Sequence, residues 1–171
     1  ILLGPRYRDL LHDIFEKKRL TQDLSIYLHR PSATDPSVAP IGCDAFYALS
    51  PVPNLDGDID WTVEGERRRQ AIVARLSQTI MPGLEHEIVT SSFITPLHFR
   101  DVLQSEKGAG FSFEPVLTQS AWFRPHNASE EVGNLYLVGA GTHPGAGLPG
   151  VLSSARILDK VVPDAVAFAG R

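Results

Sequence analysis

Residues 134–155 read NLYLVGAGTHPGAGLPGVLSSA, and this stretch decides the fold of the C-terminal part of the chain. It begins with a short apolar run, residues 135–138, whose length is typical of a buried strand. A turn rich in glycine follows, and from residue 151 small and apolar residues recur with helical spacing. The stretch therefore predicts a strand that leads into a helix through a turn whose backbone can approach a ligand closely.

The expected helix begins near Leu148–Val151, with Pro149 in its first turn, where a missing N–H costs nothing. The free N–H groups and the positive dipole end of such a helix favour an anionic or electron-rich ligand. The turn is not a Walker loop, because no Gly-Lys-Ser/Thr follows it. The match to G-x-G-x-x-G from Gly145 to Gly150 has no strand immediately before it. A strand–helix connection that uses glycine for steric reasons alone remains open beside a ligand site.

Composition describes a soluble chain that can build a core. The 171 residues are 43% hydrophobic and carry a formal net charge of -4. This balance gives no electrostatic footprint for nucleic acid or for an anionic membrane. The single cysteine, Cys43, excludes an internal disulfide and is more simply a packed or half-exposed residue than a nucleophile. No signal peptide is visible and no apolar run approaches the ~20 residues of a spanning helix.

The first hundred residues alternate between helical and extended patterns. We expect helices over 6–16, over 64–81 and from Pro96 with Thr95 as its cap, and strands over 24–30, 45–52 and 86–94. The basic group at 17–19 suits a helix C-terminus without a partner. The three arginines at 67–69 are interpreted as a solvated helix face.

An acidic turn at residues 54–60 raises the question of a metal. Asp56, Asp58 and Asp60 alternate, as calcium ligands do. The bidentate glutamate that completes such a loop is missing, so we favour a solvated turn and predict no metal site.

Residues 105–127 are rich in aromatic side chains and lack a clean period. Phe111, Trp122 and Phe123 either pack on their own domain or line a large apolar ligand site. Arg124 either helps to hold an anion or pairs with Glu114. The glycosylation sequon that begins at Asn127 is discounted, because no secretory context accompanies it.

These motifs carry a resemblance that covers essentially the whole chain. EPVLTQSAWFRPHN at 114–127, followed by NLYLVGAGTHPGAGLPGVLSSAR at 134–156, resembles the C-terminal end of the bacterial and fungal type of phytoene desaturase. These carotenoid desaturases are FAD-dependent oxidoreductases related to amine oxidases. The stretches GPRYRDLLHDIF, LSIYLHRPSATDPSVAP and DIDWTVEGERRR are similar to the same family.

The resemblance implies a mixed α/β fold. It would consist of an antiparallel-sheet substrate half with helices, and the returning C-terminal strand and helix of a largely missing Rossmann-type half. The implied division is a connecting segment 1–19, a substrate-half segment 20–105, an aromatic-rich connection 106–133 and a strand–turn–helix 134–171. The chain begins with Ile1, and we expect a fragment of a longer protein.

The resemblance also implies the site and the reaction. FAD would contact the turn and the first helical turn, at Gly139, Gly141, Thr142, Gly147, Leu148, Pro149, Gly150 and Val151. An apolar polyene such as phytoene would be dehydrogenated in an apolar tunnel, with Phe111, Trp122, Phe123 and Arg124 as candidate substrate contacts. No catalytic base can be named, and His143 is the best local candidate beside a structural role in the turn.

The implied location is cytoplasmic, or peripheral at the cytoplasmic membrane, because the substrate is membrane-soluble. One departure is large: the family's adenine-binding strand and G-x-G-x-x-G are absent near the start of this chain. We therefore expect these residues alone to bind FAD weakly or not at all. The alternatives are a flavoenzyme acting on another apolar substrate (a carotenoid isomerase, an oxidase or a retinol saturase) and a non-catalytic binding piece.

Overall fold

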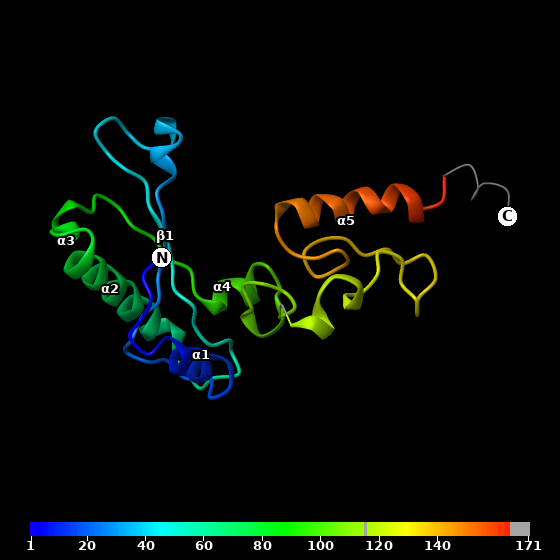
Figure 1. Cartoon of the computed structure of the whole chain (residues 1–171), viewed down its shortest axis with the longest axis horizontal. Helices are drawn as coiled ribbons and strands as arrows, with labels where there is room; N and C mark the ends of the chain where they lie inside the picture. The colour runs from blue at the N-terminus through cyan, green and yellow to red at the C-terminus, as the bar shows by residue number, and fades with distance from the viewer. Residues whose placement is uncertain (115, 165–171) are drawn as a thin grey trace. The chain divides into compact units, whose positions relative to one another are not determined.

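The computed structural model describes residues 1–114 and 116–164, which form two compact units (Figure 1). The first unit comprises residues 1–109, and the second begins at Gly110. The helices and strands are α1 Tyr7–Phe15, β1 Tyr27–His29, β2 Tyr47–Leu49, α2 Trp61–Thr79, α3 Leu84–Glu87, α4 Pro96–Asp101 and α5 Leu148–Val161. Short 3-10 turns lie at Pro31–Ala33, Pro36–Val38, Glu106–Gly108, Leu117–Gln119 and Ala121–Phe123.

A small antiparallel sheet organises the first unit. Strands β1 and β2 pair with Leu28 opposite Ala48. Leu2 and Ile26, next to β1, form a separate isolated antiparallel bridge, with N–H to carbonyl bonds of 2.8 Å in both directions. The proline-rich loop between the strands contains two 3-10 turns and no longer helix. Proline fixes φ and removes a donor, which is why the pairing stops after three residues.

The core of the first unit lies between the sheet and α2. Ile26 and Leu76 are buried together with Leu24, and Ile72 and Leu84 pack against them. Helix α2 begins at Trp61 because Asp60 caps it, its carboxylate accepting a hydrogen bond from the Thr62 N–H at 3.0 Å. The mixture of helices with a small antiparallel sheet agrees with the coarse fold class expected from the sequence.

Residues 86–94 do not form the expected strand. The chain makes the short helix α3 and then runs on as irregular backbone. Gly83, with a φ of 84°, turns the chain after α2, and the helical turn directs Leu84 into the core. Val89 and Ile94 remain exposed. The correction has a simple cause, since a β-rich composition forms a strand only beside a neighbouring strand with free hydrogen-bonding groups.

In the second unit the expected strand at 135–138 is reduced to one bridge between Ala128 and Tyr136. Backbone bonds from Ser129 to Leu135 and from Leu137 to Asn127, both 2.9 Å, hold this pair of segments together. Leu135 is exposed rather than buried. The helix that follows, α5, starts at Leu148 with proline in its first turn, as predicted.

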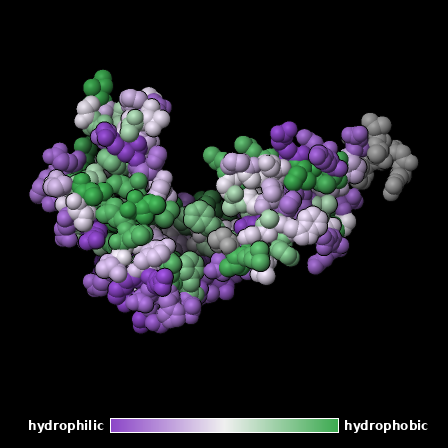
Figure 2. Space-filling view, in the orientation of Figure 1, coloured by the Kyte–Doolittle hydropathy of each residue, from purple (hydrophilic) through white to green (hydrophobic). Residues whose placement is uncertain are grey.

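Both units present apolar side chains at their surfaces (Figure 2). The most exposed of the large ones include Ile41, Val89, Phe111, Leu117 and Leu148. Apolar surface of this extent is typical of a region that another protein segment, a ligand or a membrane covers. Across the described residues, helices long and apolar enough to span a membrane are absent.

Candidate functional site

The glycine-rich turn and the start of α5 form the candidate site. The N-cap of α5 is Gly147, which has φ 89° and no side chain to cap the first N–H groups. Gly139, at the other end of the turn, has φ 121°. At both glycines a Cβ atom would meet no other atom within 4 Å, so the turn presents bare backbone to open space. Such a surface leaves room for a flat ligand to approach the helix N-terminus.

A buried polar network fixes the back of this turn. The Ser154 hydroxyl accepts a hydrogen bond from the Gly139 N–H at 3.2 Å and lies 2.8 Å from the Thr142 hydroxyl. The Thr142 hydroxyl also donates to the Gly139 carbonyl at 2.9 Å. Ser154 lies on α5, so the network joins the helix to the turn. Thr142 is buried, and its hydroxyl is bonded within this network. Its predicted contact with a cofactor stays a prediction.

Asn127 completes the network from the preceding segment. It is only 3% exposed, and its amide nitrogen donates to the Leu137 carbonyl and to both oxygens of Ser154. In the sequence, Asn127 is marked only by the glycosylation sequon and by its place at the end of EPVLTQSAWFRPHN. Its burial agrees with discounting that sequon. The signal that could have identified the residue is an amide two residues after a proline in a segment that must pack on the turn.

Arg124 lies under the turn. It is 6% exposed, and one of its terminal nitrogens donates to the Ala140 carbonyl at 2.6 Å. The guanidinium carbon lies 5.9 Å from the centroid of the Phe113 ring. An ion pair with Glu114, one of the two alternatives for this residue, is not among the ion pairs of the described residues, so that alternative is wrong for this structure. A contact between Arg124 and substrate stays a prediction.

His143 is anchored at the same turn. Its backbone N–H donates to the Pro125 carbonyl at 2.9 Å, and the ring Nδ1 lies 3.0 Å from the Ala121 carbonyl oxygen. A carbonyl only accepts, so we assign the proton of the neutral ring to Nδ1, which leaves the lone pair on Nε2. The ring lies 6.0 Å from Trp122 and 6.3 Å from His126, both edge-to-face. This geometry is suited to accepting a proton at Nε2.

The remaining predicted contacts lie on the surface of the second unit. Phe111, Trp122 and Phe123 are all exposed. Their expected role in lining an apolar site stays a prediction. Within the described part of the chain no cluster of three or more histidine, cysteine or acidic residues is placed to hold a metal ion.

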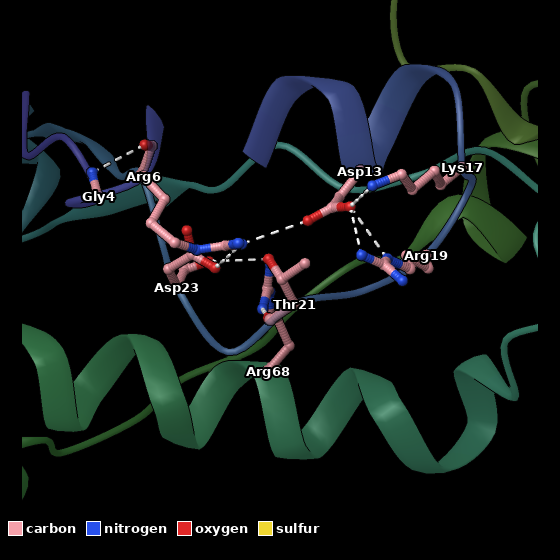
Figure 3. A network of polar contacts seen from close by, with 9 residues as sticks. Gly4, Arg6, Asp13, Lys17, Arg19, Thr21, Asp23 and Arg68 are labelled. Atoms are coloured by element: carbon pink, nitrogen blue, oxygen red, sulfur yellow. Dashed lines mark hydrogen bonds and ion pairs between the residues drawn. The ribbon is translucent and has the colours of Figure 1, made fainter. Parts of the chain in front are cut away.

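A second polar cluster, in the first unit, lies around Asp13 (Figure 3). Asp13 is 1% exposed, and its carboxylate accepts hydrogen bonds from Lys17 at 3.2 Å, Arg19 at 3.0 Å and Arg6 at 3.3 Å. Burial alone raises the pKa of this carboxyl, but the three cationic donors together lower it below its ordinary value of 3.8. Two of the three basic residues at 17–19, Lys17 and Arg19, therefore have a partner, contrary to the sequence-based interpretation.

Arg68 also departs from the expected solvated face of α2. Arg67 and Arg69 pair with Glu64 and Glu66 on the helix surface. Arg68 instead donates to the Thr21 carbonyl at 2.7 Å, and burial lowers the pKa of its guanidinium (Figure 3). The Asp13 cluster and Arg68 thus fasten α1 and α2 to residues 19–23, which is a structural role.

Comparison with known proteins gives the family. The family model described as flavin containing amine oxidoreductase matches residues 53–157. The chain is 52% identical to the phytoene desaturase (neurosporene-forming) of Rhodobacter capsulatus, over 96% of this chain and 32% of that protein. It is 55% identical to the phytoene desaturase (lycopene-forming) of Pantoea ananas, over 91% of this chain and 32% of that protein. It is 36% identical to the 4,4'-diapophytoene desaturase (4,4'-diaponeurosporene-forming) of Staphylococcus aureus, over 96% of this chain and 34% of that protein.

The chain therefore belongs to the flavin-containing amine oxidoreductase family. Within that family it is similar to carotenoid desaturases along nearly its whole length. The chain spans about a third of the length of the curated relatives that it matches. The family model covers both the acidic turn before α2 and the glycine-rich turn before α5.

Proposed function

We propose that the protein containing this chain is an FAD-dependent carotenoid desaturase that introduces conjugated double bonds into phytoene or a similar polyene. The observation that carries the proposal is an identity above 50% to phytoene desaturases over more than nine-tenths of this chain. The reaction class is an oxidation of a CH–CH bond. We further propose that the described α5 and its turn are the returning part of a Rossmann-type FAD-binding half.

The residues at the turn fit a flavin. Gly139 and Gly147 leave open space where a side chain would project, and the N-cap of α5 provides N–H groups that no side chain covers. We propose that Gly141, Leu148, Pro149, Gly150 and Val151 complete the cofactor contacts; Gly141 and Gly150 would do so through backbone, since a Cβ there would meet Ser112 and the Gly145 carbonyl. When bound, FAD supplies the acceptor for the hydride that leaves the substrate. The N–H groups of the first helical turn would stabilise negative charge that develops there.

The chain's own residues would orient the substrate and move a proton. The exposed aromatic side chains Phe111, Trp122 and Phe123 provide the apolar surface that a polyene requires. His143 presents the lone pair of Nε2 beside the turn, and it is our candidate for the group that takes the proton. A new double bond forms once the hydride and the proton have left neighbouring carbons.

We propose that the protein works in the cytoplasm or peripherally at the cytoplasmic membrane. A polyene substrate dissolves in lipid, and exposed apolar side chains on both units support contact with a lipid surface. Flotation of the full-length protein with phospholipid vesicles tests this location. Full recovery in the unbound fraction would contradict it.

The test of function is product analysis with the full-length protein. Purified protein with bound FAD is incubated with phytoene or 4,4'-diapophytoene in vesicles, and the products are separated by chromatography. We expect conjugated products from phytoene, with diapophytoene as the poorer substrate, because identity to the diapophytoene desaturases is lower. Isomerised or oxygenated products would favour another flavoenzyme. A full-length protein without flavin bands would contradict the proposal altogether.

A further inference from the structure

Arg124 is a buried cation whose hydrogen bonds go to carbonyl oxygens. One terminal nitrogen donates to the Ala140 carbonyl at 2.6 Å, and the other lies 3.5 Å from the Phe113 carbonyl. The side chain also lies beside Gly145, where an added Cβ would be 3.3 Å from the Arg124 Nε. The guanidinium therefore bonds to the turn at residue 140 and lies beside it at residue 145.

The charge of Arg124 is not balanced by a carboxylate. Among the described residues it takes part in none of the ion pairs, whereas the Asp13 cluster pairs every one of its cations. Burying a charge without a counter-charge is costly, and carbonyl oxygens return only part of that cost. A glutamine in this position could donate to Ala140 at a smaller cost. The arrangement thus keeps a positive charge directly behind the turn.

We propose that Arg124 is a positioning residue that fixes the glycine turn and supplies the positive charge that stabilises the reduced, more negative form of the bound flavin. This inference rests on the proposed function. In a region shielded from water, a fixed cation acts on a nearby developing negative charge more strongly than it would in solvent. Arg124 thereby raises the reduction potential of the flavin.

The test uses the full-length protein and three variants. Arg124→Gln removes the charge and keeps a donor, Arg124→Lys keeps the charge and loses the planar fork, and Arg67→Gln is the control at an exposed arginine on α2. Three quantities are measured: the flavin content, the flavin midpoint potential, and the dissociation constant of sulfite. Sulfite is an anion whose complex with bound flavin is favoured by positive charge near the ring.

We expect Arg124→Gln to weaken sulfite binding about tenfold. We also expect it to lower the midpoint potential by about 30 mV, which corresponds to a tenfold change in the equilibrium constant of a two-electron couple. Arg124→Lys should stay closer to the wild type in both quantities, and Arg67→Gln should match the wild type. An unchanged potential in Arg124→Gln overturns the inference, and so does a Lys variant as impaired as the Gln variant.

Two further outcomes keep the inference testable. If Arg124→Gln retains no flavin, the Lys variant decides alone: a near-wild-type sulfite affinity supports the inference, and a tenfold loss overturns it. A wild-type protein that binds no flavin contradicts the proposed function itself. A wild type with bound flavin, together with Arg124 variants of unchanged potential, contradicts only the role of Arg124.

Discussion

The side-chain amide of Asn127 donates hydrogen bonds to both the hydroxyl and the carbonyl oxygen of Ser154, at 2.9 and 3.2 Å. Ser154 lies in the second turn of α5, 27 residues further along the chain. The pair therefore ties the segment before the glycine turn to the helix after it. The Ser154 hydroxyl also holds the Gly139 N–H, so one buried serine joins the start of the turn to the helix that follows it.

Asn127→Ala is expected to destabilise the protein by about 1–3 kcal/mol, because it leaves the buried oxygens of Leu137 and Ser154 without their donor. Flavin affinity should fall as the turn loosens. Chemical denaturation and flavin titration of the full-length protein measure both effects. Gln78→Ala, at an exposed amide on α2, is the matched control and should change neither quantity. Wild-type stability in Asn127→Ala would contradict the role given to this network.

Gly150→Ala tests the packing of the first turn of α5. Alanine normally favours a helix over glycine by about 1 kcal/mol. Here the added Cβ would lie 2.5 Å from the carbonyl oxygen of Gly145, so we expect lower stability and weaker flavin binding. Gly133→Ala is the control, because a Cβ there meets no atom within 4 Å. Thermal melting of both variants distinguishes the two effects. A clash lowers the melting temperature of Gly150→Ala, whereas helix propensity alone would raise it.

His143→Gln tests the proposed proton acceptor. Glutamine can keep a hydrogen bond to the Ala121 carbonyl but has no basic nitrogen, so we expect the desaturation rate per bound flavin to fall about 100-fold. The flavin content should change little. A lower flavin content with an unchanged rate per bound flavin would instead indicate that His143 only supports the turn.

The Asp13 cluster predicts a loss of stability in acid. The pKa of Asp13 in the folded protein is lowered below 3.8, so the ionised carboxylate contributes its full stabilisation above that value. The contribution is lost as the pH falls through the folded pKa. Unfolding midpoints from neutral pH down to about pH 2 should therefore decline less steeply in Asp13→Asn than in the wild type. Asp9→Asn, at an exposed position of the same helix, should retain the wild-type profile.

Ile26→Ala tests the core of the first unit. Ile26 is fully buried, and removing its side chain should cost about 2–5 kcal/mol of unfolding free energy. Ile41→Ala removes the same atoms from an exposed loop position and should cost much less. Equal effects in the two variants would mean that residue 26 is not packed as described.

The sequence predicted those elements whose signals are local. The proline and glycines before residue 151 located α5, and the periodicity after Trp61 located α2, although the cap at Asp60 extends that helix beyond its expected start. The expected strands at 86–94 and 135–138 failed because a strand depends on a partner that periodicity does not reveal. Side-chain partners likewise account for Lys17 and Arg19, which bond to the Asp13 carboxylate.

Helical geometry alone could have corrected the prediction that the three arginines at 67–69 share a solvated face. Successive residues on a helix are about 100° apart, so three in a row do not share one solvated face. Arg68 follows Gly65 and precedes Ile72 with helical spacing, and this face of α2 packs against the rest of the first unit. The candidate site divides in the same way between local and distant signals. Its glycines lie close together in sequence, while Asn127 and Arg124 act across long loops.

The burial of Asn127 also bears on how the protein is produced. Its amide nitrogen is the atom to which an N-linked glycan would be attached, and in the folded chain that atom holds three hydrogen bonds in the interior. Oligosaccharyltransferase acts on unfolded chains in the secretory pathway. A glycan added there would keep α5 from closing on the turn, so export through that pathway should yield misfolded protein. Ser129→Ala removes the sequon while keeping Asn127, and it should restore folding in such a host.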